Sequence, residues 1–117
     1  MATKPFTPVR IGDTNDTESV VWILNDGDDG APYQRANFPD RSVQLFGTFG
    51  GGTVVIEATN EAAPAPGTWQ TLTDPTGVPL SFTAANLKQV VEIHRHLRPR
   101  VVGGAGVAVT VILVARR

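Results

Sequence analysis

The chain has no cysteine, one methionine and two histidines, and only 18% of its 117 residues are charged. Without cysteine it can form neither a disulfide framework nor a thiolate metal site, so packing or a partner must stabilise it. Its longest apolar run, from Val107 to Ala115, is too short to cross a bilayer as a helix. The first ten residues lack the apolar segment of a secretory signal. We therefore expect a chain that carries no export address and makes no contact with a membrane.

Glycine and proline are abundant, with 12 and 9 residues, and this favours turns and strands over long helices. At this length a single domain with one core is expected. Short β-branched and aromatic runs recur between turn signals, at 19–24, 42–49, 53–59, 68–73, 80–82, 97–102 and 107–115. The sequence therefore predicts an all-β fold, a β-sandwich or jelly-roll of about seven to eight antiparallel strands, with a small closed barrel as the alternative.

Three segments carry more specific local signals. The triplet Gly50–Gly52 joins two strand-like runs and predicts a β-hairpin; no phosphate-binding lysine follows it. Residues 84–91 space their apolar side chains as a helix does and predict at most one short helix. Residues 107–115 are apolar on both faces of an extended strand. Such a strand needs cover on both sides, from the opposing sheet and from either a helix or another subunit.

Residues 1–18 contain Pro5 and Pro8 and little apolar periodicity, so we expect an extended N-terminal arm that needs a partner surface to become ordered. Residues 19–117 form the predicted β-sandwich domain. Charge is unevenly distributed, because 13–29 holds six acids and no base whereas 88–117 holds six bases and one acid. This asymmetry can steer head-to-tail docking between neighbours. Two solvated loops of opposite sign remain the alternative.

The residues that could carry catalysis or bind a metal are few. No serine lies in a nucleophile-elbow context, so a hydrolase triad with His94 or His96 is not indicated. Glu92, His94 and His96 would share one face of an extended strand, which leaves a zinc or nickel site open as an alternative to a solvated or interfacial histidine pair. The acidic loop 26–30 resembles a calcium loop but has glycine at a ligand position, so an ordinary acidic turn is favoured.

Two further alternatives concern ligand surfaces. Trp22 and Trp69 could stack on a sugar, but they lie within strand patterns, which favours core packing. The five C-terminal arginines could contact nucleic acid, but the net charge is −1 and no nucleic-acid-binding motif surrounds them. Ion pairs with a protein neighbour are therefore preferred.

The order of four segments, 45–60, 67–77, 80–85 and 97–100, resembles that of small virion proteins of tailed bacteriophages, the capsid decoration or cement type. The resemblance covers about residues 42–117. It implies a β-sandwich subunit, made in the host cytoplasm, that sits on the outer surface of the head and bridges subunits of the major capsid protein to stabilise the shell. The rival interpretation is a tail or fibre component with a carbohydrate-binding β-sandwich.

From these observations we predict a structural protein with no enzymatic activity, no cofactor and no metal site. The expected partners are the major capsid protein and two further copies of this chain, as a homotrimer, with no nucleic acid and no membrane. The expected interface consists of the reaching arm and of arginines that contact an acidic neighbour. Its residues are Thr3, Pro5, Phe6, Pro8, Val9, Arg10, Ile11, Arg95, Arg98 and Arg100.

Overall fold

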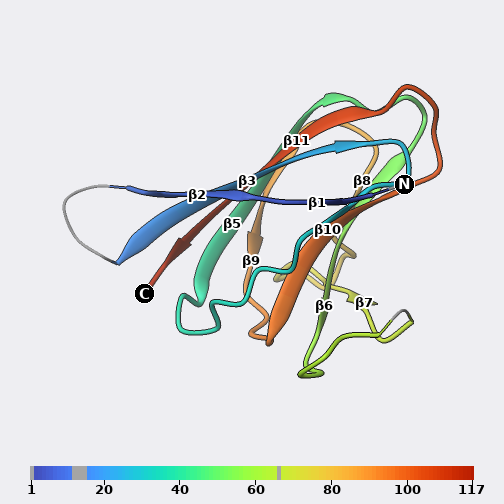
Figure 1. Ribbon diagram of the computed structural model, residues 1–117. Helices are drawn as coiled ribbons and strands as arrows, with labels where there is room; N and C mark the ends of the chain where they lie inside the picture. Colours follow the sequence, from blue (N-terminus) through green and yellow to red (C-terminus); the bar gives the residue numbers. More distant parts are fainter. Residues whose placement is uncertain (1, 12–15, 66) are drawn as a thin grey trace.

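A computed structural model describes residues 2–11, 16–65 and 67–117, and it forms two β-sheets packed face to face (Figure 1). Eleven strands are present in these residues, seven of them four or more residues long, and no helix occurs among them. The predicted all-β sandwich of the jelly-roll kind is therefore confirmed. No helix in the described part of the chain could cross a membrane. The expected short helix at 84–91 is wrong, because a strand runs through most of this segment.

One layer is a five-stranded sheet in which all neighbours are antiparallel. Its order is β2 (Thr7–Arg10), β3 (Thr17–Asn25), β11 (Ala108–Arg116), β5 (Asp40–Thr48) and β9 (Asn86–Val90). The other layer has six strands in the order β1 (Thr3–Lys4), β4 (Asp29–Gly30), β10 (His96–Val102), β6 (Thr53–Thr59) and β7 (Gln70–Thr71), with β8 (Ser81–Phe82) also paired to β6. Only the short pair of β1 and β4 is parallel.

The core lies between the two sheets and follows the alternation of the strands. Inward residues of β3 and β11, among them Trp22 and Leu113, are fully buried, and Ile56 and Leu97 face them from the six-stranded sheet. The indole Nε1 of Trp22 donates a 3.0 Å hydrogen bond to the carbonyl of Ala31, which satisfies its one polar group. Core packing of Trp22 is thus confirmed, and this side chain has no surface on which a sugar could stack.

The glycine triplet at 50–52 forms a corner between the layers, so the hairpin prediction is wrong. The strands on either side of it, β5 and β6, belong to different sheets and pair with other strands. Gly50 and Gly51 have φ values of 59° and 76°, a conformation that other residues rarely adopt. The carbonyl of Gly50 accepts a 3.0 Å hydrogen bond from the backbone N–H of Ala105, which lies in the turn between β10 and β11. The corner is therefore held by a neighbouring turn and not by a hairpin ladder.

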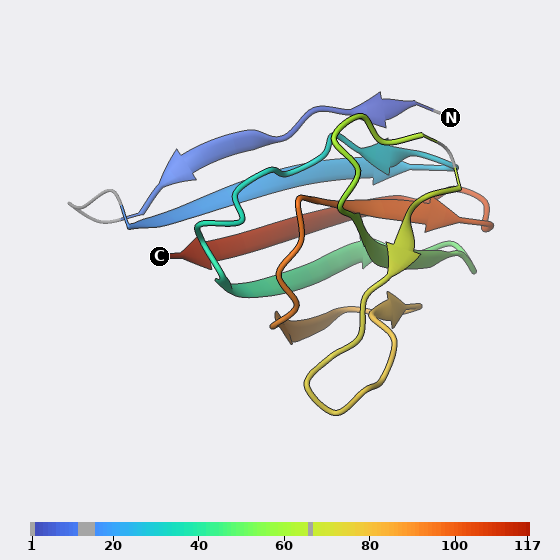
Figure 2. The same ribbon diagram turned by 90° about the horizontal axis from the view of Figure 1, so that it is seen from below.

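The N-terminal segment lies along its own domain (Figure 2). In it, β2 forms the edge of the five-stranded sheet and β1 forms an edge of the six-stranded sheet. Backbone hydrogen bonds join it to β4 and to the residue after β4, from the N–H of Asp29 to the carbonyl of Ala2 at 3.0 Å and from the N–H of Ala31 to the carbonyl of Lys4 at 2.7 Å. Between the two strands, Phe6 packs edge-on against Trp22 with ring centroids 5.5 Å apart. In this structure residues 2–11 are ordered by these contacts and do not extend away from the sandwich.

Candidate functional site

The side of the five-stranded sheet that faces away from the core is exposed, and we call it the outer face. Figure 2 shows the six-stranded layer and its loops on the opposite side of this sheet. Strand register places the outward residues in rows that cross the strands. The central row is Thr7, Val21, Ile112, Gln44 and Leu87. On one side of it lie Val9, Ser19, Val114, Ser42 and Gln89, followed by Thr17, Arg116 and Asp40; on the other side lie Ile23, Thr110 and Phe46, followed by Asn25, Ala108 and Thr48.

The outer face is almost free of charge and carries several exposed apolar side chains. Ile23 and Leu87 are each 62% exposed and Phe46 is 42% exposed, although all three are large hydrophobic residues. The only charged residues that point outward from these five strands are Asp40 and Arg116, and they pair with each other. At ~4.8 Å between strands and ~3.3 Å per residue, the strands present about 570 Å². Of the nineteen outward residues in these rows, eight are apolar, nine are polar without charge and two form the ion pair, so apolar side chains cover only part of this area.

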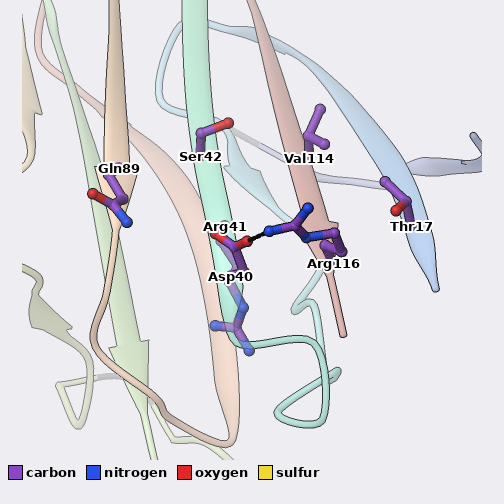
Figure 3. A pocket seen from close by; sticks show the side chains of 7 residues that line it. All are labelled: Thr17, Asp40, Arg41, Ser42, Gln89, Val114 and Arg116. Carbon is purple, nitrogen blue, oxygen red and sulfur yellow. Dashed lines mark hydrogen bonds and ion pairs between the residues drawn. The ribbon is translucent and has the colours of Figure 1, made fainter.

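A hollow of about 530 Å³ indents one end of the outer face (Figure 3). Ser42, Val114 and Gln89 form its floor and sides, and the pair of Arg116 and Asp40 lies at its end. Figure 3 shows the guanidinium of Arg116 turned toward Asp40. Both side chains of the pair are at least half exposed, so it contributes little to stability. Arg41 also lines the hollow.

The outer side of the six-stranded sheet is different, because it carries a network of four charged residues. Nε of Arg98 and Nε of Arg100 both donate to Oε1 of Glu57, at 2.8 and 3.0 Å, and Glu57 is only 2% exposed. Arg98 also donates to Asp29 at 3.1 Å, and its guanidinium lies 4.1 Å from the centre of the Trp69 ring. Trp69 therefore packs on Arg98, whose side chain is 16% exposed, on the outer side of the six-stranded sheet, and not in the core as the sequence suggested.

The structure separates the predicted interface residues into three places. Arg98 is committed to the network within the domain, and Arg100 is partly committed, with 40% of its side chain exposed. Thr3 lies in the same sheet, since β4 pairs with both Thr3 and Arg100. Pro8, Val9 and Arg10 lie in the edge strand β2, where Val9 belongs to the outer face. Arg95 is exposed and uses only its backbone, donating to Asn60 at 2.9 Å. Contact between these predicted interface residues and a partner stays a prediction.

The histidines do not form a metal site with Glu92. Oε1 of Glu92 accepts hydrogen bonds from the backbone and the hydroxyl of Thr73, and no group of three or more potential ligands gathers among the described residues. His94 is 7% exposed, and its Nε2 lies 3.0 Å from Nη1 of Arg41. A guanidinium can only donate, so Nε2 carries a lone pair. Burial first, and then the charge of Arg41, lowers the pKa of His94 to about 4.

The acidic loop uses its carboxylates on backbone amides. Asp28 accepts from the backbone N–H groups of Ala2 and Asn25 at 2.9 and 2.8 Å, and Asp26 accepts from Val107 at 2.6 Å. Burial acts to raise the pKa of Asp28, but these hydrogen bonds and Lys4 outweigh it and lower the pKa. The loop therefore anchors Ala2 near the N-terminus and Val107 just before β11.

Sequence reasoning identified the outer face only in part. The two-sided apolar pattern of residues 107–115 called for cover on both sides, and the structure covers its inward side while Ile112 and Val114 stay on the outer face. Phe46 and Ser42 were missed. Their strand reads as one with a single buried face, and no local signal shows that Phe46 points outward beside other apolar side chains.

No protein-family model matches the chain, and no curated protein sequence matches it. Solved structures do match. A cupin domain from Bordetella pertussis Tohama I has a TM-score of 0.50 and 13% identity, covering 99% of this chain and 96% of that one. KdgF from Halomonas sp. has a TM-score of 0.43 and 13% identity, over 96% and 79% of the two chains. A double-stranded β-helix domain protein from Klebsiella pneumoniae has a TM-score of 0.44 and 17% identity, over 93% and 76%.

These matches correct the expectation of a phage capsid decoration protein. The full-length match is to a cupin domain, so the resemblance to virion proteins is wrong as an identification, and the placement on the outer surface of a virion and the tail or fibre alternative lose their support with it. At 13% identity the match shows a cupin-like jelly-roll fold and nothing further. The fold neither supports nor removes the expectation that the chain is not an enzyme. The predicted partners, a major capsid protein and a homotrimer, are not tested by the structure.

Proposed function

We propose that this chain is a non-enzymatic binding subunit that pairs with a second copy of itself through the outer face of its five-stranded sheet. The observation that carries the proposal is an exposed five-stranded face in which every outward residue except one mutually paired couple is uncharged. The same chain places Glu57, Arg98 and Arg100 on the outside of its other sheet. Low overall charge therefore does not account for the neutrality of the outer face.

A second copy is the partner that such a surface suits. A face without net charge meets no like-charge repulsion when it is placed against itself, whereas a charged partner would leave its own charges unpaired there. Two copies of about 570 Å² would bury about 1,100 Å² in total, above the ~1,000 Å² that separates specific interfaces from incidental contacts.

The remainder of the structure supports binding over catalysis. The space between the sheets is filled by buried apolar side chains, among them Trp22, Leu45 and Leu97, so the described chain encloses no reaction chamber there. Two of the buried ionisable residues are engaged within the domain, since Glu57 accepts from two arginines and His94 accepts from Arg41, whereas both ring nitrogens of the buried His96 have no hydrogen-bond partner among the described residues.

The proposal is tested by measuring mass in solution by light scattering as the protein is diluted. We expect twice the 12.4 kDa of one chain, dissociating at low concentration. Ile112→Lys places a lysine at the centre of the outer face; two unpaired lysines per dimer, at ~1.4 kcal/mol or more each, weaken the dimer at least about 100-fold. The matched control is Val102→Lys, which changes an exposed strand valine on the other sheet and leaves the dimer intact.

If Ile112→Lys does not fold, as judged by circular dichroism, Ile23→Lys tests the same face at a position that is 62% exposed. A wild-type chain that stays monomeric at the highest soluble concentration would overturn the proposal. So would a dimer that Val102→Lys dissociates and Ile112→Lys does not.

A further inference from the structure

We infer the register of this dimer: its two-fold axis runs across the strands along the central row, so that Phe46 of each copy enters the hollow beside Ser42 of the other. The inference rests on the proposed self-association and adds the orientation and the specificity-determining residue. It follows from strand register, from the position of the hollow and from the symmetry that an isologous interface must obey.

The two ends of the outer face differ in shape over β11, β5 and β9, while a second, smaller hollow lies beside β2 and β3 and is lined by Lys4, Pro5, Thr7, Val21 and Ile23. At one end Ser42, Val114 and Gln89 line the hollow. At the other end Phe46 lies beside Thr110 in the sheet and is 42% exposed, so a large side chain stands out from the surface. Ser42 and Phe46 are on the same strand, and Gln44 in the central row lies midway between them.

Two sheets packed face to face by a two-fold axis allow two simple orientations. If the axis crosses the strands along the central row, each strand faces its own copy with reversed direction, and Phe46 of one copy meets Ser42 of the other. The projection then fills the hollow at both ends of the interface, and Arg116 faces the uncharged Ala108 end. Shape and charge are both satisfied.

If the axis instead runs along β11, each outward residue of β11 meets its own copy. Arg116 would then face Arg116 of the second copy, and the two hollows would face each other empty. Like charges placed opposite each other and unfilled space both weaken an interface. The geometry therefore favours the axis that crosses the strands.

Cysteine crosslinking distinguishes the two orientations, because the chain has no cysteine of its own. With the axis along the central row, Gln44→Cys brings two thiols directly opposite each other across sheets that are ~10 Å apart. Val114→Cys is the matched control: it lies one row away, so its two thiols are ~13 Å apart along the strands in addition to the gap between the sheets. A short bismaleimide should link Gln44→Cys into a covalent dimer and leave Val114→Cys unlinked.

A size exchange tests the contact between Phe46 and the hollow. Phe46→Ala should weaken the dimer about 100-fold or more, because two aromatic side chains per dimer leave their pockets and each contributes ~1.4 kcal/mol or more at such a position. Ser42→Phe should weaken it as well, since it fills the hollow from within the same copy. The double variant Phe46→Ala with Ser42→Phe should regain most of the lost affinity, because the projection and the space have changed places.

The outcomes separate this inference from the proposed function. A wild-type dimer in which Val114→Cys crosslinks, or in which Gln44→Cys fails to, overturns the register and leaves self-association standing. A double variant that is weaker than either single variant overturns the contact between Phe46 and the hollow. A wild-type chain that shows no dimer removes the proposed function, and the register falls with it.

Discussion

The buried pair of His94 and Arg41 should make this protein lose stability in mild acid. Arg41 is 2% exposed, and its guanidinium donates to the carbonyls of Phe38 and Arg35 at 2.7 and 2.8 Å as well as to His94. Among its recorded contacts there is no carboxylate. A proton on His94 would therefore place a second buried positive charge 3.0 Å from the first and remove the lone pair that accepts from Arg41.

The size of the effect follows from the pKa of His94, which is lowered from 6.5 to about 4 in the folded protein. Between these values the unfolded chain binds more protons than the folded chain, so the free energy of unfolding falls as the pH falls. The contribution of His94 is fully present above pH ~6.5, decreases by about 2 kcal/mol at pH ~5 and by about 3 kcal/mol below pH ~4. Domains of this size are stabilised by only ~5–15 kcal/mol, so the change is readily measured.

The assay is urea unfolding between pH 7 and pH 4, followed by the fluorescence of the buried Trp22. Protein concentration is held constant, because any dimerisation also contributes to the apparent stability. The matched variant is His94→Gln, whose amide oxygen can accept from Arg41 but does not titrate. We expect the wild-type curve to fall through this range and the variant curve to stay nearly flat. Equal slopes for the two proteins, or a wild-type stability that is unchanged from pH 7 to pH 5, would refute the reasoning.

Two further predictions concern the fold. Arg98→Glu places a third carboxylate beside Glu57 and Asp29, so it should lower the free energy of unfolding by about 3 kcal/mol or more, measured by thermal unfolding. The control Arg95→Glu changes an exposed arginine and should alter the free energy of unfolding by less than about 0.5 kcal/mol. Similar effects of the two variants would mean that the network is not buried. Gly47→Ala would place its Cβ 2.3 Å from a backbone oxygen at φ 127° and should cost about 2 kcal/mol or more. At Gly51 an added Cβ meets nothing within 4 Å, so Gly51→Ala should lower the free energy of unfolding by only about 1 kcal/mol, from the strained φ alone. An equal loss at both glycines would show that the strained φ, and not the contact with the backbone oxygen at Gly47, determines the destabilisation.

The strands were predictable from the sequence because alternation is a local property. Side chains two apart share one face, so the run at 42–49 reveals both a strand and its inward side, with Val43 and Leu45, without knowledge of any partner. The run at 107–115 is apolar on both faces, so it reveals a strand but not which side is inward; the structure places Leu113 on the inward side. Fold class follows from the number of such runs and the turns between them.

Strand pairing was not predictable, and this explains the errors. Glycine at 50–52 permits a tight turn but does not say whether the chain returns beside the same strand or crosses to the other sheet; the contact with Ala105, more than 50 residues away, decides that. In residues 84–91, the spacing of Leu87 and Val90 fits a helix, but pairing with β5 prevails and puts one of them outward and the other inward. Tertiary context overrides a weak local preference in both cases.

The charged network was invisible to the sequence for the same reason. Glu57 and Arg98 are 41 positions apart and meet because β6 and β10 are neighbours in register. The separation of acids and bases along the chain suggested docking between molecules, yet several of these charges neutralise each other within one molecule, as Asp29 and Arg98 do at 3.1 Å. A charge pattern along a sequence gives the composition of a surface but not the partner of each charge.

The difference between the two outer faces is the strongest reason to place the function on the five-stranded sheet. A strand face that only meets water gains nothing from Ile23, Phe46 and Leu87, because exposed apolar side chains lower solubility without adding to the core. The six-stranded sheet shows that this chain can build a charged outer face and cover part of it with Trp69. The face of the five-stranded sheet is uncharged and has a projection at one end and a hollow at the other. These features suit a surface that becomes buried when the protein binds a partner. The symmetry of its register about the central row makes a second copy of the same face the partner that fills it.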